Sequence, residues 1–186
     1  VPAGMPDDVS AMVALEDAGQ GYLVLSSALE DSLQCYRIST DGSLKKVDTI
    51  GAADGLGINR PDVLATVTLD GQAFVLAGAA GSSSLSVVSL DKGVMTATDH
   101  VVDSLDTRFQ TVNALATTVV GDRAYVVAAG GDDGLTLMSL LPTGRLVVLD
   151  TIADSLEMGL DNVESLGLVA DGGVLRIYAG SATEGG

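Results

Sequence analysis

The sequence predicts an all-β protein made of a repeated four-stranded unit, and three observations lead to this prediction. The 186 residues include 23 glycines between short runs of Val, Leu and Ile, a pattern typical of strands joined by tight turns. An aromatic residue stands in one such run of each unit, at Tyr22, Phe74, Tyr125 and, slightly shifted, Tyr178. These residues are 52, 51 and 53 positions apart, which indicates an internal repeat.

A second series has the same period. Asp48-Thr49-Ile50, Asp99-His100-Val101 and Asp150-Thr151-Ile152 recur at an interval of 51 residues. Two independent markers therefore share one repeat. We interpret the three aspartates as charges on the outermost strand of each unit, where they discourage edge-to-edge pairing of sheets.

Turn residues divide each unit into four segments, named here strands A to D. The turns from A to B contain Asp70-Gly71, Gly121-Asp122 and Asp171-Gly172, residue pairs that tolerate the positive φ angles of tight hairpins. The turns from C to D contain Asp41-Gly42, Lys92-Gly93 and Thr143-Gly144. Consecutive strands are therefore predicted to be antiparallel neighbours.

Four antiparallel strands repeated about every 51 residues are typical of the blades of a β-propeller, whose radial sheets bury both faces. Another repeated β architecture is the remaining alternative; a helical solenoid is disfavoured because Gly and β-branched residues interrupt any helical period. We expect residues 1–186 to form one partial propeller of about three and a half blades, from a seven-bladed parent. The expected bounds are about 9–50, 63–101 and 112–152 for three blades and about 163–180 for the half blade.

One complete C-to-D segment carries a family resemblance. The run from Cys35 to Ile50, CYRISTDGSLKKVDTI, resembles blades of lactonase-type seven-bladed propellers and of propeller regions in secreted bacterial proteins of the hemolysin-type calcium-binding class. The resemblance implies the propeller fold, not a catalytic motif. The Gly-Gly-x-Gly-x-Asp calcium repeat of the second class is absent, and Gly130–Gly134 is only superficially similar to it.

The half blade predicts a partner. A half blade leaves an unpaired sheet edge, and an open arc exposes apolar faces. A second copy of this chain would supply another A–B half and not the missing C–D half. We therefore expect a further polypeptide segment, from the same parent, to complete the propeller, with residues 180–186 as the loop that leads into it.

Composition excludes several functions. Nine Lys and Arg against 25 Asp and Glu give a formal net charge of −16, which disfavours nucleic acid as a partner. No apolar run is long enough for a membrane span. With Cys35 and His100 as the single residues of their kinds, disulfides, Cys/His zinc sites and Cys–His catalysis lack the necessary side chains. We expect Cys35 to be an inert buried thiol, and we predict no catalytic residue.

The acidic residues are predicted to gather on one face. B-to-C and D-to-A loops emerge together at one end of a propeller, and they hold fourteen of the 25 acidic residues but only Arg60 and Arg108 as basic ones. The candidate binding face is Asp54, Asp62, Asp103, Asp106, Asp154, Glu157 and Asp161. Glu30, Asp31, Asp132 and Asp133, in equivalent loops, are candidate ligands for Ca²⁺, which prefers carboxylate oxygens. The alternative is that these loops only maintain solubility.

Two functions remain open at this stage. The first is a noncatalytic binding or scaffold module of a larger secreted bacterial protein, extracellular or at the cell surface, which presents the acidic face to a protein, a glycan or a divalent cation. No cofactor other than Ca²⁺ is expected. The alternative is part of a lactonase-like propeller hydrolase, whose carboxylates activate water directly or through a metal.

Overall fold

The computed structural model describes residues 5–181, which form four consecutive antiparallel sheets. Sheet 1 contains β1 (Ala11–Asp17), β2 (Gln20–Ser27), β3 (Ser32–Ile38) and β4 (Leu44–Gly51). Sheet 2 contains β5 (Pro61–Leu69), β6 (Gln72–Ala79), β7 (Ser84–Asp91) and β8 (Val94–Val102), after the short 3-10 helix η1 (Ala52–Asp54). Sheet 3 contains β9 (Ala114–Val120), β10 (Arg123–Ala129), β11 (Gly134–Leu140) and β12 (Leu146–Ala153). Sheet 4 contains β13 (Val163–Asp171) and β14 (Val174–Ser181).

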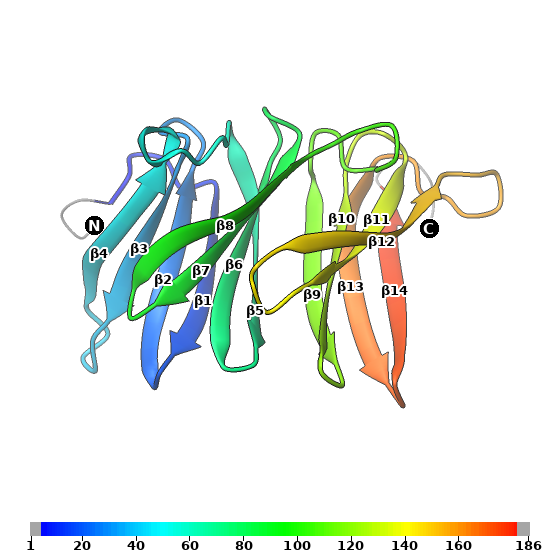
Figure 1. Ribbon diagram of the computed structural model, residues 1–186. Helices are drawn as coiled ribbons and strands as arrows, with labels where there is room; N and C mark the ends of the chain where they lie inside the picture. The colour runs from blue at the N-terminus through cyan, green and yellow to red at the C-terminus, as the bar shows by residue number, and fades with distance from the viewer. Residues whose placement is uncertain (1–4, 182–186) are drawn as a thin grey trace.

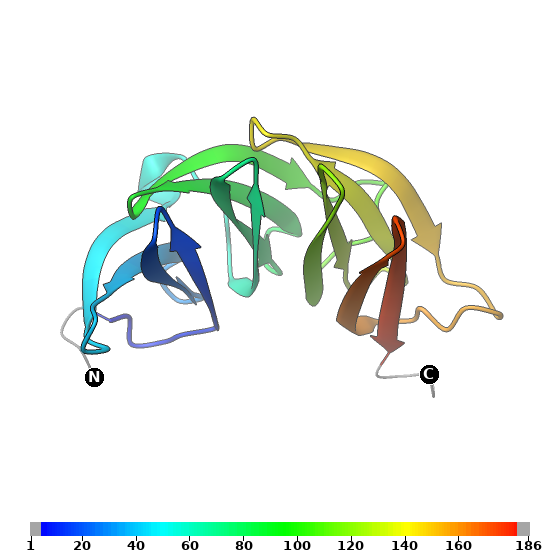
Figure 2. The same ribbon diagram turned by 90° about the horizontal axis from the view of Figure 1, so that it is seen from below.

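The sheets stand side by side along an open arc, as Figures 1 and 2 show. In each complete sheet the strands pair in chain order, from A to D. The D strands β4, β8 and β12 lie on the outside of the arc, and the A strands lie toward its inside (Figure 2). The predicted all-β fold is confirmed, and the three full sheets with one half sheet form a β-propeller fragment. No helix in the described residues is long and apolar enough to cross a membrane.

The hairpin turns have the backbone that their residues favour. Between β5 and β6, Asp70 and Gly71 both have positive φ, 50° and 79°, and the pairing continues up to Leu69 and Gln72 on either side. Two consecutive positive φ angles match the right-handed twist of the strands that they join. The predicted A-to-B hairpins are therefore tight two-residue turns.

Three apolar layers between the sheets hold the arc together. Tyr22 and Val24 from sheet 1 pack with Val75 of sheet 2, and Phe74 and Leu76 of sheet 2 pack with residues of sheet 3. The third layer joins sheet 3 to β13 and β14. Tyr22 is 4% exposed and Phe74 1%. Because burying one such side chain contributes on the order of 2 kcal/mol, these layers are the main source of stability.

The recurrent aspartates of the D strands connect neighbouring sheets. Each complete D strand has a β-bulge immediately before its aspartate, at the register shifts opposite Cys35/Tyr36, Val87/Val88 and Leu137/Met138. The bulge turns the carboxylate toward the following sheet. Asp48 accepts a hydrogen bond from the Met95 amide at 2.7 Å, and Asp99 accepts one from the Leu146 amide at 2.7 Å. The sequence pattern predicted edge charges at these positions, and it did not predict that Asp48 and Asp99 join one sheet to the next.

One marker of the repeat has a different position in the last sheet. Gln72 pairs with Leu69 directly after the β5–β6 turn, and Val174 pairs with Asp171 directly after the β13–β14 turn. Counted from these pairs, Tyr178 corresponds to Leu76 rather than to Phe74. Tyr178 is 58% exposed, on the face of sheet 4 that no further sheet covers in the described structure.

Candidate binding face

The loops between B and C strands and between D and A strands lie at one end of the arc, at the top in Figure 1. We call this end the loop-end face, and the opposite end, with the A–B and C–D turns, the hairpin end. The antiparallel order A-B-C-D makes this division unavoidable, because alternate connections must emerge at opposite ends. The predicted binding-face residues and calcium ligands all come from loop-end segments or from the strand residues next to them.

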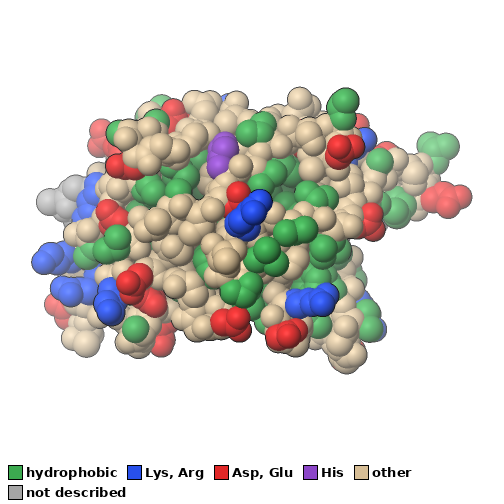
Figure 3. Space-filling model, viewed as in Figure 1, with side chains coloured by type: hydrophobic (Ala, Val, Ile, Leu, Met, Phe, Trp, Pro, Cys, Tyr) green, Lys and Arg blue, Asp and Glu red, His purple; other side chains and the backbone are tan. Residues whose placement is uncertain are grey.

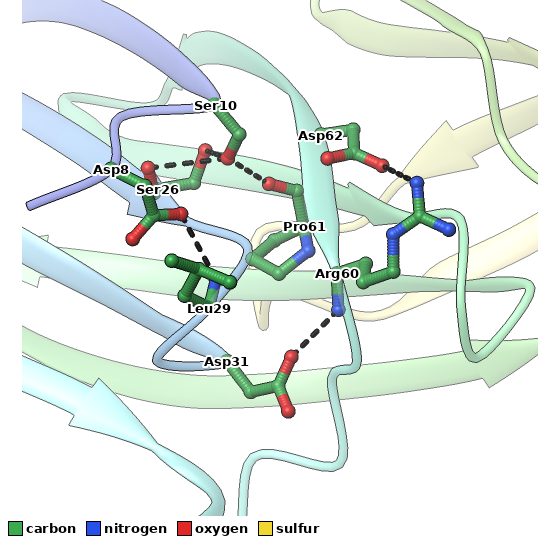
Figure 4. Close-up of polar contacts among 8 residues, drawn as sticks. All are labelled: Asp8, Ser10, Ser26, Leu29, Asp31, Arg60, Pro61 and Asp62. Carbon is green, nitrogen blue, oxygen red and sulfur yellow. Dashed lines mark hydrogen bonds and ion pairs between the residues drawn. The ribbon is translucent and has the colours of Figure 1, made fainter.

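A repeated contact at this face joins each B–C loop to the next sheet. The Asp31 carboxylate accepts a hydrogen bond from the Arg60 amide at 2.7 Å, as Figure 4 shows. The same contact joins Ser83 to the Thr111 amide at 3.1 Å and Asp133 to the Asn162 amide at 3.3 Å. All six residues have positive φ angles, between 46° and 55°. We call these three contacts the loop latches.

The latches explain a gap in the sequence pattern. The second B–C loop has Ser82 and Ser83 where the first and third loops have carboxylates, so it lacks a metal ligand of the kind predicted there. Ser83 supplies a hydroxyl oxygen where Asp31 and Asp133 supply carboxylate oxygens, so the backbone amide has an acceptor in all three cases. Sequence analysis missed Ser83, although its distance of 28 residues from Thr111 nearly equals the 29 residues in the two other pairs.

The four predicted calcium ligands have separate protein partners. Asp132 accepts from the Gln110 amide at 3.1 Å, and Glu30 accepts from the Gln34 side-chain amide at 2.8 Å. Asp31 and Asp133 belong to the latches of different sheets. Within residues 5–181, no three or more His, Cys, Asp or Glu side chains gather in a group that could hold a metal ion. Calcium binding by these residues stays a prediction, without a converging set of ligands.

Three carboxylates of the predicted binding face order their own loops. Asp103 accepts from the Phe109 amide at 3.1 Å, and Asp154 accepts from the Leu160 amide at 2.6 Å, six residues ahead in both cases. Asp54 accepts from the Gly51 amide at 3.1 Å. These contacts hold negative charge in place on the loop-end face.

The remaining members of the predicted face differ in exposure. Asp62 forms an ion pair with Arg60 at 3.6 Å, visible in Figure 4, and both side chains are partly open to solvent. Asp106 and Glu157 are exposed, and Asp161 is half-buried in the loop that precedes β13. Asp106 and Glu157 are therefore, with Asp54, the members of the predicted binding face that are exposed to an incoming partner.

Two carboxylates at the loop-end face have shifted pKa values, in opposite directions. Partial burial, reinforced by the negative charge of Asp103, raises the pKa of Asp132. At the first loop, a hydrogen bond from the Ser27 hydroxyl lowers the pKa of Asp8. In the described structure, thirteen acidic and two basic residues lie at this end, which gives it 13 minus 2, or 11, net negative charges; the predicted fourteenth residue, Glu184, lies outside the described residues.

We assign no chemical role to Cys35 and His100, the single cysteine and the single histidine of the chain. Burial raises the pKa of the Cys35 thiol to about 12, and the charge of Asp48 adds to the effect. His100 is on the outer strand β8, and its Nδ1 atom lies 2.8 Å from the hydroxyl of Ser86 on β7. In the space-filling view of Figure 3, the histidine lies near the loop end of the visible surface.

Fold and face together define a class: an incomplete β-propeller with an acidic loop end. Solved structures share the fold. A protein of unknown function from Desulfotomaculum acetoxidans matches with a TM-score of 0.63 at 15% identity, over 82% of this chain and 44% of that one. A protein from Lactobacillus plantarum matches with a TM-score of 0.57 at 18% identity, over 76% of this chain and 40% of that one.

A third similar structure is an enzyme, the exo-β-1,3-galactanase 1,3Gal43A from Clostridium thermocellum. Its TM-score is 0.56 at 9% identity, over 90% of this chain and 40% of that one. At such identities the likeness establishes the fold alone. The chain spans less than half the length of these three structures. No family model and no curated protein matches the sequence.

Proposed function

We propose that this chain is part of a noncatalytic propeller module that binds a basic protein surface through its loop-end face. The module belongs to a larger secreted bacterial protein and acts outside the cell or at its surface. The observation that carries the proposal is the segregation of charge, with thirteen acidic and only two basic described residues at one end. A field of one sign over one face accelerates the approach of an oppositely charged partner and orients it.

The arrangement of the carboxylates favours an extended partner over a single bound ion. The loop latches and the contacts of Asp103 and Asp154 separate the carboxylates and fix them along several loops. Charges spread in this way suit several Lys or Arg side chains on a broad surface better than they suit one ion, whose ligands must converge. A divalent cation and a neutral glycan are therefore the less favoured ligands.

Binding of poly-L-lysine, measured by titration calorimetry, tests the proposal with two charge-matched variants. Asp106→Asn with Glu157→Gln removes two exposed charges from the loop-end face, and Glu16→Gln with Asp122→Asn removes two from the hairpin end. We expect the loop-end variant to bind several-fold more weakly, because each lost charge contact removes a few tenths of a kcal/mol or more. Equal losses in the two variants would contradict the proposal, because they would reflect net charge alone.

A hydrolase is the second candidate, and one observation favours it. Asp132 combines a raised pKa with a neighbouring carboxylate, Asp103, a combination common among general acids and bases. The similar structures include a galactanase, and the sequence resembles lactonase-type propellers. Hydrolysis of lactones or β-1,3-galactans by the parent protein, abolished by Asp132→Asn, would establish this candidate in place of the first.

A further inference from the structure

The hairpins between C and D strands attach to the preceding sheet by a repeated contact. In sheet 2, the buried turn residue Gly93 lies against Tyr22 and Val47 of sheet 1, and two residues later the Met95 amide donates to Asp48. In sheet 3, Gly144 lies against Thr98 of sheet 2, and two residues later the Leu146 amide donates to Asp99. A Cβ atom at either glycine would lie within 3 Å of these side chains, so only glycine fits.

Sheet 3 has the same acceptor groups, but no hairpin occupies them in the described structure. Asp150 is the third recurrent aspartate. One of its carboxylate oxygens accepts a hydrogen bond from the Thr151 amide at 2.9 Å, and Asp48 and Asp99 accept the equivalent bond from the residue that follows each of them. Within residues 5–181, the second oxygen of Asp150 has no hydrogen bond of the kind that Asp48 and Asp99 accept from the next sheet. Asp48 and Asp99 are half-buried, whereas Asp150 is exposed. Tyr125 and Leu149 correspond to Tyr22 and Val47.

The surface around these groups is apolar and hollowed. Val147 is 43% exposed and Leu149 50%, and with Tyr125 they line a pocket of about 300 Å³. Hydrophobic side chains are visible over β12, right of the centre in Figure 3. We call Tyr125, Val147, Leu149 and Asp150 the hairpin cradle.

The last strand of sheet 4, β14, corresponds in the repeat to β6, which pairs with the first strand of the hairpin that contacts sheet 1. β2, β6 and β10 each pair on both sides, with an A strand and with a C strand. In the described structure, residues 174–180 of β14 pair with β13 alone, so this part of the backbone has no strand partner on its other edge. Figure 1 shows β14 at the end of the arc.

We propose that the hairpin cradle and the edge of β14 together bind a two-stranded β-hairpin. Its first strand pairs with β14, its turn places a glycine against Tyr125 and Leu149, and the amide two residues later donates to Asp150. This inference rests on the proposed function, because it names the segment that completes the module. The two internal interfaces of the same kind support it. A second copy of the chain does not fit, since each of its C–D hairpins is already paired within a full sheet.

A fusion protein tests this proposal with a hairpin whose docking is already known. Residues 84–102, which form β7 and β8, are appended after Gly186. The five residues 182–186 then form the connection, one more than residues 80–83, which connect β6 to β7. Linking the hairpin to the chain raises its effective concentration at the cradle. A scrambled sequence of the same nineteen residues is the control.

The readout is hydrogen exchange of the β14 amides, with the mass of the particle measured in parallel. In the fusion, the outward amides of β14 should exchange about tenfold more slowly than in the scrambled control, and the protein should be monomeric. Asp150→Ala should remove most of this protection, whereas Glu16→Ala, which removes an exposed carboxylate from sheet 1, should leave it unchanged. The unfused Asp150→Ala protein corrects for the lost contact with Thr151.

Two results would overturn the proposal: equal exchange in the fusion and the scrambled control, or dimers of the fusion joined through β14. Poly-L-lysine binding by the same fusion is measured separately. The hairpin can dock on the cradle in a protein that does not bind poly-L-lysine, and poly-L-lysine can bind where the hairpin does not dock. The failure of one proposal is therefore distinguishable from the failure of the other.

Discussion

The ionised form of Asp132, at the loop-end face, opposes folding. Its folded-state pKa is raised, first by partial burial and then by the charge of Asp103. A raised carboxyl pKa means that folding favours the protonated form, so the contribution of Asp132 to stability is greatest below its unfolded pKa. This contribution is lost as the pH rises through the folded pKa.

Asp132→Asn should therefore stabilise the protein at pH 7. The amide oxygen of Asn retains the acceptor for Gln110 and removes the charge. Solvent screening limits the gain to a few tenths of a kcal/mol, about 1 °C in the melting temperature. The gain should disappear near pH 3, where Asp132 is protonated in both states. Calorimetric melting at the two pH values checks the prediction, and a gain that persists at low pH would contradict it.

Cys35 allows a second prediction for a single residue. With its thiol buried and its pKa raised to about 12, almost no thiolate is present at pH 8. Since the thiolate is the nucleophile, the native protein should resist alkylation by iodoacetamide until it opens or unfolds. We expect the labelling rate to increase steeply through the urea transition, as mass spectrometry would detect. Rapid labelling without denaturant would contradict the buried position of β3.

At the scale of the element, the loop latches connect one sheet to the next. Asp31→Ala should destabilise the protein by about 1–2 kcal/mol, because the Arg60 amide loses its acceptor. Asp31→Ser is the matched variant, since Ser83 performs this role with a hydroxyl at the equivalent position. We expect Asp31→Ser to recover at least half of the loss in urea unfolding, with the slope m unchanged. Similar losses in both variants would show that the latch contributes little.

The elements could be predicted from the sequence, but their contacts with neighbouring sheets could not. Turn pairs such as Asp70-Gly71 are local signals, and they predicted the hairpins. The latch of Ser83 joins residues 28 positions apart, and a hydroxyl there replaces a carboxylate, so residue type concealed the equivalence. Tyr178 misled the alignment of the last repeat for a related reason, because aromatic identity is a weaker marker than the pairing of Asp171 with Val174.

At the scale of the whole molecule, the concentration of negative charge predicts how salt affects stability. The chain has a formal net charge of −16, and most of it lies at the loop-end face. Folding brings the carboxylates of this face closer together than they are in the unfolded chain. At low ionic strength this self-repulsion opposes folding, and salt screens it with a Debye length of about 10 Å at 0.1 M. The melting temperature should therefore rise by several degrees when NaCl increases from about 0.02 to 0.5 M.

The same experiment separates screening from binding of calcium. CaCl₂ and NaCl at equal ionic strength should raise the melting temperature by similar amounts if the carboxylates act only through their summed field. The variant with Asp106→Asn and Glu157→Gln should depend less on salt than the variant with Glu16→Gln and Asp122→Asn, because only the first reduces charge where it is concentrated. A rise specific to CaCl₂ at micromolar concentration, lost in Asp133→Asn, would indicate an ion held by convergent ligands. That result would replace a basic protein with a divalent cation as the favoured ligand of this face.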